Sequence, residues 1–463
     1  MAEKIKSMTE GSPVRLIASF ALPLMLGNIF QQLYTVVDTM VVGRILGVQA
    51  LAALGASDWL NWLMLGMVSG FAQGFSIQIA QEFGAGNMEK LRRAFACSIT
   101  LAAILSVLLL LFSQWSLHTI LIWMSTPEDI IGDAILYLRI MFCGIPLLMA
   151  YNMAASVLRA MGNGKVPLYA MILSSSINIV LDILFVGGFH MGISGAAIAT
   201  VIAEGCSAVY CIMVIKRISC LSLRQGEKEK KEASYWRMDV GLAGRLLLLS
   251  APIAFQAVMI SVGGLVVQSV VNGFGVVFIA GFTATNKLYG ILEIAATAYG
   301  FAVTTYTGQN LGAGNIKRIK DGVRAGMLVA AATSVVISAV MILFGSKIVG
   351  LFISGEPSQV AEATTIAYHF LLVLSIPLVI LYFLYVYRSA LQGMGDTMIP
   401  MLSGVAEFIM RIAAVFVLPL IYGPEAVFFA EIAAWLGADV ILITAYYIRI
   451  HQFTNRFRVR QEK

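Results

Sequence analysis

Twelve apolar stretches, each of about 20 residues or more, recur along this chain of 463 residues. A helix needs about 20 apolar residues to cross the hydrocarbon core of a bilayer. The stretches lie approximately at 14–42, 50–81, 94–116, 134–157, 167–187, 193–215, 246–271, 278–307, 325–345, 366–388, 398–420 and 426–448. Only 12% of the residues are charged, against about 25% in soluble domains, so the chain lacks the polar surface of a soluble protein. We therefore predict an all-α polytopic membrane protein with twelve transmembrane helices.

The lysines and arginines divide the connecting loops into two classes. When the termini and every second loop are assigned to one side, that side holds 26 of the 31 basic residues and the opposite side holds three. Loops rich in Lys and Arg stay in the cytoplasm, so we expect both termini to be cytoplasmic. The net charge of +6 comes from 31 basic and 25 acidic residues, and because nearly all of the basic residues are assigned to the cytoplasmic side we interpret it as a signal of topology and expect no nucleic-acid partner.

The second half of the chain repeats motifs of the first half. The segment QEFGAGNMEKL at 81–91 resembles QNLGAGNIKRI at 309–319, at an offset of 228 residues. Because each half holds six stretches, both halves begin on the same side of the membrane, as in a parallel repeat that encloses a central cleft. We predict three parts in chain order: an N-terminal six-helix lobe at 1–215, a cytoplasmic basic linker at 216–245 and a C-terminal six-helix lobe at 246–463.

These ordered motifs resemble the multidrug and toxic compound extrusion (MATE) family of antiporters. The first stretch contains LPLMLGN and VVDTMVVGRILG, GAGN follows the second and eighth stretches, and LRAMGNGKVP and NIVLD come between. The resemblance covers nearly the whole chain and is closest to the bacterial DinF-like and MepA-like branches. It implies a multi-pass protein of the bacterial plasma membrane that performs multidrug efflux coupled to ion transport. We expect it to be a monomer.

Two acidic residues lie within apolar stretches of the first half, where an ionisable side chain costs about 2.5–3.5 kcal/mol and marks a candidate functional site. Asp182 follows Asn178 by one helical turn, and Asp38 and Thr200 lie at a similar depth in the first and sixth stretches. Carboxylate, amide and hydroxyl oxygens bind small hard cations, and a pair of neighbouring carboxylates can instead share a proton. We predict a coupling site at Asp38, Asn178, Asp182 and Thr200 for Na⁺ or H⁺, with no other cofactor. The resemblance implies the same four positions.

The alternative interpretation is that the two acids are structural and satisfied by their neighbours. The repeat argues against it, because the positions in the second half that match Asp38 and Asp182 are Val267 and Val415. A requirement of the fold would be expected in both halves.

The predicted substrate cleft lies between the two lobes. The polar residues assigned to it are Gln31, Tyr34, Gln256, Tyr289 and Glu293. Glu293 could bind a cationic drug or a proton, and the alternative is an interhelical hydrogen bond. NorM-like members of the family place a cation-binding acid in the seventh helix, but this chain has none there, which weakens the case for a second cation site. Glu407 and Arg411, four residues apart, predict an ion pair within their helix or between the lobes.

The leading functional hypothesis is a secondary active antiporter that exports amphipathic, cationic drugs or toxic compounds by alternating access. The sequence has no P-loop, so direct use of ATP is not expected. The alternative is a lipid-linked oligosaccharide flippase, which would need a cationic cavity. Only Arg139 and Arg411 are assigned to the spans, because Arg15 and Arg388, at the ends of their stretches, are counted with the cytoplasmic loops. The four histidines are scattered, with neither an HExxH nor a GxSxG motif, so we do not expect an enzyme. The expected partners are small amphipathic molecules and the lipid bilayer.

Overall fold

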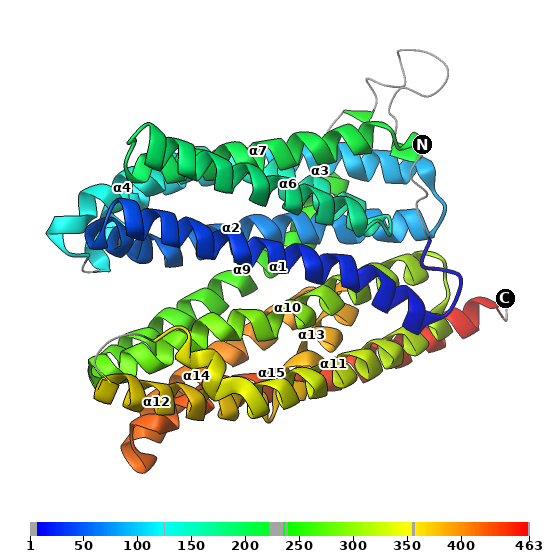
Figure 1. Cartoon of the computed structure of the whole chain (residues 1–463). Helices are drawn as coiled ribbons and strands as arrows, with labels where there is room; N and C mark the ends of the chain where they lie inside the picture. Colours follow the sequence, from blue (N-terminus) through cyan, green and yellow to red (C-terminus); the bar gives the residue numbers. More distant parts are fainter. Residues whose placement is uncertain (1–6, 125, 222–234, 237–238, 354–356, 462–463) are drawn as a thin grey trace. The chain divides into compact units, whose positions relative to one another are not determined.

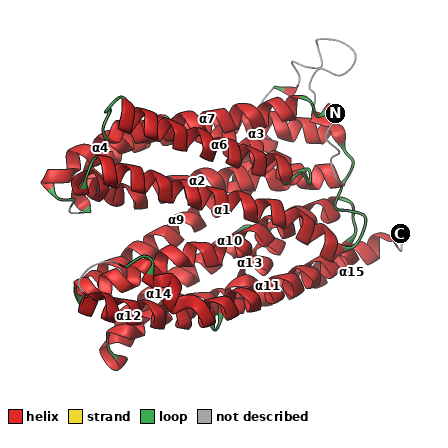
Figure 2. Cartoon of the chain, in the orientation of Figure 1, coloured by secondary structure: helices red, strands yellow, loops and turns green. Residues whose placement is uncertain are grey.

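The computed structural model describes residues 7–124, 126–221, 235–236, 239–353 and 357–461. Within these ranges the chain forms helices joined by short loops, and no strand (Figure 2). The α-helices, labelled in Figure 1, are α1 (Pro13–Ile45), α2 (Val48–Gly84), α3 (Met88–Trp123), α4 (Glu128–Cys143), α5 (Ile145–Ala160), α6 (Lys165–Asp182), α7 (Ile193–Lys216), α9 (Val240–Val271), α10 (Val276–Gly312), α11 (Ile316–Gly350), α12 (Pro357–Ser375), α13 (Leu378–Gly393), α14 (Met398–Tyr422) and α15 (Phe429–Gln461). A π-helix, η1 (Ile183–Gly188), extends α6, and the short 3₁₀-helices are η2 (Ser219–Leu221), η3 (Asn272–Phe274) and η4 (Pro424–Phe428).

The helices confirm the predicted all-α fold with twelve spans in two repeats. Among the described residues, ten helices are long and apolar enough to cross a membrane, and two bent helix pairs bring the number to as many as twelve. The prediction of one continuous helix at 134–157 and another at 366–388 is wrong, because each of these spans consists of two helices with a break between them. The pair α4–α5 bends by 47° and the pair α12–α13 by 49°. Pro146 and Pro377 stand at the two breaks, where proline removes a backbone donor and disfavours a helical residue before it.

The chain divides into two compact units, which are described separately. Unit 1 is built from Leu22–Ala254, and unit 2 combines Met8–Ala21 with Phe255–Lys463. The start of α1 therefore packs in unit 2 and the start of α9 in unit 1, so the unit boundaries fall inside these two helices. The predicted linker at 216–245 includes 222–234 and 237–238, which lie outside the described residues, and its role as a boundary stays a prediction.

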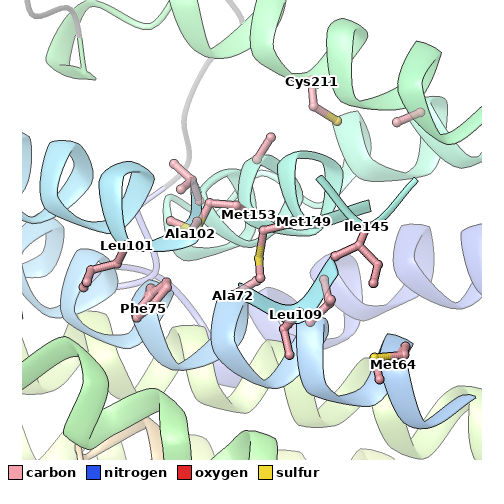
Figure 3. Close-up of a cluster of buried hydrophobic side chains, with 14 of the residues drawn as sticks. Met64, Ala72, Phe75, Leu101, Ala102, Leu109, Ile145, Met149, Met153 and Cys211 are labelled. Atoms are coloured by element: carbon pink, nitrogen blue, oxygen red, sulfur yellow. The ribbon is translucent and has the colours of Figure 1, made fainter. Parts of the chain in front are cut away.

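The core of unit 1 is an apolar cluster of side chains from α2, α3, α5 and α7 (Figure 3). Met64, Met149 and Met153 belong to it, each with no more than 5% of its surface exposed. Flexible thioether side chains fill irregular gaps between helices. These three methionines therefore serve packing in unit 1.

The repeated GAGN motif forms the same turn in both halves of the chain. Gly86 and Gly314 adopt positive φ angles of 69° and 73°, a backbone conformation that favours glycine. Asn87 and Asn315 then cap α3 and α11, since each side chain accepts a hydrogen bond from the backbone N–H three residues further on. The motif thus ends one helix and begins the next within four residues.

We expect Gly74→Ala to destabilise unit 1 by about 1–3 kcal/mol, because overpacking a tight helix contact carries that cost. A Cβ atom at Gly74 in α2 would lie 2.2 Å from the Cα atom of Ser250 in α9, and backbone cannot move aside easily. Thermal unfolding of the purified protein in detergent measures the effect. Gly55→Ala is the matched control in the same helix, because nothing lies within 4 Å of its Cβ position. Equal melting temperatures for the two variants would contradict this packing.

Candidate coupling and substrate-binding sites

Two of the predicted coupling residues are joined by a hydrogen bond between neighbouring helices. Nδ2 of Asn178 in α6 donates to Oγ1 of Thr200 in α7 over 3.2 Å. The Thr200 hydroxyl donates in turn to the carbonyl oxygen of Ala196 over 3.1 Å. Because both side chains are buried, this bond fixes the amide of Asn178 with its oxygen free to accept.

Asp182 is the last residue of α6 and is completely buried. It lies one turn beyond Asn178, and the π-helix η1 begins directly after it. A π-turn holds an extra residue and changes the direction of the following side chains, and such turns are frequent at functional sites. The local backbone therefore departs from a regular helix at the point where the buried carboxylate is placed.

Asp38 brings a second carboxylate to the same place from α1. Its side chain is 7% exposed, and it lies close enough to Asp182 for the two carboxyl groups to repel each other. Asp58 in α2 adds a further negative charge near Asp38. Asp38, Asn178, Asp182 and Thr200 thus form one cluster inside unit 1.

The cluster has an excess of buried oxygen acceptors. Among the described residues, no donor from another side chain or from the backbone reaches Oδ1 of Asp38, Oδ1 of Asn178 or either carboxylate oxygen of Asp182. The carboxyl groups of Asp38 and Asp182 lie within hydrogen-bonding reach of each other, a bond that exists only when one of them carries a proton. A buried polar atom left without a partner costs about 1–3 kcal/mol, and more when it is charged. Each of these atoms is an acceptor, so the missing group is a donor or a positive charge. The arrangement can hold a proton or a small cation.

The set of oxygen atoms also limits which ions would fit. No group of three or more His, Cys, Asp or Glu side chains that could hold a metal ion occurs in the part of the chain that the structure describes. The cluster combines two carboxylates with neutral amide and hydroxyl oxygens. Oxygen ligands suit hard cations, whereas transition metals favour nitrogen and sulfur. The residues therefore offer oxygen ligands of the kind that a small hard cation prefers, and a pair of carboxyl groups that can hold a proton.

Gln31 and Tyr34, both predicted to line the cleft, lie on α1 in unit 1, where their side chains interact. Tyr34 lies near the carboxyl groups of Asp38 and Glu204. Glu204 in α7 was not among the predicted site residues, although its position one turn after Thr200 placed it on the same face of the helix. Tyr34 thus lies within electrostatic reach of the coupling cluster and of a further, partly buried acid.

The other three predicted cleft residues lie in unit 2. Glu293 in α10 accepts a hydrogen bond from the Tyr385 hydroxyl in α13, which is the interhelical bond of the alternative interpretation. Tyr289 stacks on Trp435 with ring centres 6.3 Å apart. Gln256 packs on Gly404, and its Nε2 atom has no partner among the described residues. That the residues of the two units line one common cleft stays a prediction.

Glu407 and Arg411 both form ion pairs, but the predicted pairing within their helix is wrong, and the partners that the structure shows come from neighbouring helices of unit 2. Glu407 pairs with Arg388 of α13, and Nη2 of Arg411 lies 2.8 Å from Oε2 of Glu431 in α15. The spacing of four residues placed both charges on one side of α14, but it could not show that neighbouring helices supply partners to each. Arg388 was counted among the loop residues, yet it is 7% exposed within α13. Unit 2 therefore holds a buried ion pair, Arg388 with Glu407, and a partly buried pair, Arg411 with Glu431.

The chain is similar to a known protein family, to named relatives and to solved structures. The MatE family model matches residues 23–184 and 252–417. The Bacillus subtilis (strain 168) proteins named "Probable multidrug resistance protein" YoeA and YpnP are 31% and 30% identical to the chain, over 74% and 77% of its length and 74% and 78% of their own. A crystal structure of MATE in complex with MaL6 shares the fold, with a TM-score of 0.87 and 21% identity over 97% of this chain and 98% of that one.

Proposed function

The chain belongs to the MatE family of multidrug transporters, and we propose that it is a secondary active antiporter with both termini in the cytoplasm. It would export amphipathic, cationic compounds in exchange for Na⁺ or H⁺. The observation that carries this proposal is the cluster of buried, unpartnered acceptor oxygens at Asp38, Asn178 and Asp182. A site that needs a positive charge to satisfy its own atoms is suited to binding and releasing a coupling ion.

The coupling ion would act by joining three helices. Asp38 lies on α1, Asp182 on α6 and Thr200 on α7, so one bound cation would be attracted to oxygens from all three. Without it, the two carboxylates repel each other in a low-dielectric interior. An ion that binds one arrangement of these helices more tightly than another shifts the population toward it. Ion binding and release would thus favour different states of the transport cycle.

The ion gradient supplies enough free energy for concentrative export. One elementary charge moved across a potential of 100 mV gains about 2.3 kcal/mol. Since a factor of ten in concentration corresponds to about 1.4 kcal/mol, one ion can sustain a gradient of roughly 50-fold for a neutral substrate. A substrate with one positive charge loses the same amount, about 2.3 kcal/mol, on its way out, so its export needs a second ion or the concentration gradient of the ion itself. One or two ions per cycle would therefore suffice for drug efflux.

The substrate contacts would include an acidic and aromatic group in unit 2. Tyr289, stacked on Trp435, lies within electrostatic reach of Glu293 and Glu431. Aromatic faces and carboxylates together attract organic cations. Glu431 is already paired with Arg411, so Glu293 is the acid that we assign to a cationic substrate.

We expect Glu293→Gln to raise the KM for ethidium by about tenfold, because a lost charge contact of about 1.4 kcal/mol has that effect. The KM for a zwitterionic substrate should change little. Initial rates of dye transport in proteoliposomes measure both values. Glu362→Gln, which removes an exposed carboxylate from α12, is the control. An unchanged KM for ethidium would remove Glu293 from the substrate site.

The flippase alternative is weaker, because the buried arginines of unit 2 are already neutralised. Arg388 and Arg411 each pair with a glutamate, so neither offers an unpaired positive charge to a pyrophosphate. A lipid-linked oligosaccharide would need such charges.

Transport in proteoliposomes tests the proposed function. Vesicles are loaded with ethidium, and a Na⁺ gradient and a pH gradient are imposed separately. We expect at least one gradient to drive dye movement against its concentration, and no movement against the gradient when both are absent. Dye transport whose rate depends on neither gradient, or that requires ATP, would overturn the proposal.

A further inference from the structure

Unit 2 contains a cavity that belongs neither to the coupling cluster nor to the predicted substrate cleft. It lies between α11 and α15 and has a volume of about 250 Å³. Its lining residues are Lys320, Val323, Arg324, Met327, Tyr446, Tyr447, Ile450 and His451. Cationic and hydroxyl groups therefore meet in one cavity with an apolar wall.

The two fixed positive charges of this cavity have no acidic partner. Lys320 and Arg324 are one turn apart on α11, so they share a face, and no ion pair reaches either of them within the described ranges. Other basic residues nearby do have partners. Arg318 donates to Asn310 over 3.0 Å, and Arg449 lies 2.6 Å from Asp396. Within the described residues, the cavity thus brings together two cationic side chains that form no ion pair.

Tyrosines supply hydrogen-bonding groups next to these charges. Tyr446 is 4% exposed and lies within electrostatic reach of Arg324. Its ring packs against those of Tyr387 and Tyr447, at centroid distances of 5.3 and 5.4 Å. This packing holds the rings in place at the wall of the cavity. Hydroxyl donors beside two cations are suited to the oxygens of a phosphate.

The surface beside the cavity is apolar and exposed. On α11, Leu328 is 65% exposed and Val335 63%, and on α15, Val440 is 68% and Ile448 52% exposed. In a membrane-spanning helix such residues face the lipid chains. Along α11 and α15, the exposed apolar residues lie next to the basic residues of the cavity. Such a change from apolar to basic residues is expected at the level of the lipid headgroups, and we place the cavity there.

The matching positions in the first half of the chain do not hold a pair of basic residues. At the repeat offset of 228 residues, Arg92 matches Lys320 and Ala96 matches Arg324. Nε of Arg92 donates to the carbonyl oxygen of Cys220 over 3.1 Å, so this arginine is already bonded. Since the matching positions lack a free pair of charges, the pair at Lys320 and Arg324 is not a requirement of the fold.

We propose that this cavity binds the phosphate group of an anionic lipid. Lys320 and Arg324 neutralise the phosphate, Tyr446, Tyr447 and His451 surround it, and the acyl chains lie along the exposed apolar faces of α11 and α15. The volume is below the roughly 300–1,000 Å³ of sites for drug-sized ligands, and it suits a headgroup whose chains remain outside. A free phosphate has the same chemistry, but it would gain nothing from the neighbouring apolar surface.

Native mass spectrometry of the full-length protein released from nanodiscs tests the proposal. The nanodiscs contain equal amounts of phosphatidylglycerol and phosphatidylcholine. We expect the protein to retain phosphatidylglycerol preferentially, and Lys320→Gln with Arg324→Gln to reduce that preference by about 30-fold, as expected for the loss of two basic residues at a membrane surface. The matched control is Lys317→Gln with Lys347→Gln, which removes two charges from α11 outside the cavity and should leave the preference intact.

Two further measurements keep the result interpretable. Thermal unfolding of each double variant shows that it remains folded. Inorganic phosphate, added to the protein in detergent without phosphatidylglycerol, tests the soluble source. Weak binding of inorganic phosphate together with a strong lipid preference supports the proposal. An equal lipid preference in both double variants, or tight binding of inorganic phosphate with no lipid preference, would overturn it.

Discussion

Asp182→Asn will lower cation-driven ethidium efflux by about 100-fold. The substitution keeps the size of the side chain but removes one of the two carboxylates that face each other in the coupling cluster. A factor of 100 corresponds to about 2.7 kcal/mol, which lies within the range of about 1.5–3 kcal/mol for hydrogen bonds to charged groups. Asp38→Asn will have an effect of the same kind. Initial rates in proteoliposomes under an imposed Na⁺ or pH gradient measure both variants.

The control for these variants is Asp133→Asn, which removes an exposed carboxylate from α4 in the same unit. It should retain the full rate. Binding of ethidium to each purified variant separates a loss of coupling from a loss of substrate affinity. Full gradient-driven efflux by Asp182→Asn would show that the buried acids are structural.

Arg388→Gln will destabilise the protein by about 3–5 kcal/mol, the cost of leaving a buried charge without its partner. Arg388 and Glu407 are both buried in unit 2, and the Arg388 charge also reaches Asp439, whose Oδ1 atom has no hydrogen-bond partner among the described residues. Removal of the guanidinium would leave two buried acids without a compensating charge. Thermal unfolding in detergent measures the loss.

A second substitution separates charge from packing in this prediction. If the unpaired charge is the cause, Glu407→Gln added to Arg388→Gln should recover part of the lost stability, and Asp439→Asn added to both should recover more. Arg449→Gln, which breaks a half-exposed ion pair with Asp396, should cost no more than about 1 kcal/mol. A loss of equal size in the Arg388 and Arg449 variants would contradict the assignment of the buried pair.

The number and order of the spans could be predicted from the sequence, because hydrocarbon thickness fixes the length of an apolar stretch. The breaks within two of them could not. Pro146 and Pro377 stand inside apolar runs, and proline is tolerated in membrane helices when neighbouring groups satisfy the freed backbone. Pro23, Pro252 and Pro419 lie inside unbroken helices, so a proline in an apolar run does not by itself predict a break.

The candidate site, too, could be predicted from the sequence only in part. Helical periodicity placed Asn178 and Asp182 on one face, and the structure joins Asn178 to Thr200. The ion pairs of unit 2 were missed because spacing along α14 describes one helix and says nothing of the residues that face it. Arg388 could be found only from the packing of α13 against α14.

Substrate-driven counterflow tests the central claim most directly. Proteoliposomes without any imposed ion gradient receive ethidium on one side, and the movement of radioactive Na⁺ and of protons in the opposite direction is recorded. We predict that the dye gradient drives one of these ions the other way, and that Asp38→Asn with Asp182→Asn abolishes the ion movement. Ion counterflow of full size in the double variant, or dye movement without movement of either ion, would contradict an antiporter coupled at these two residues.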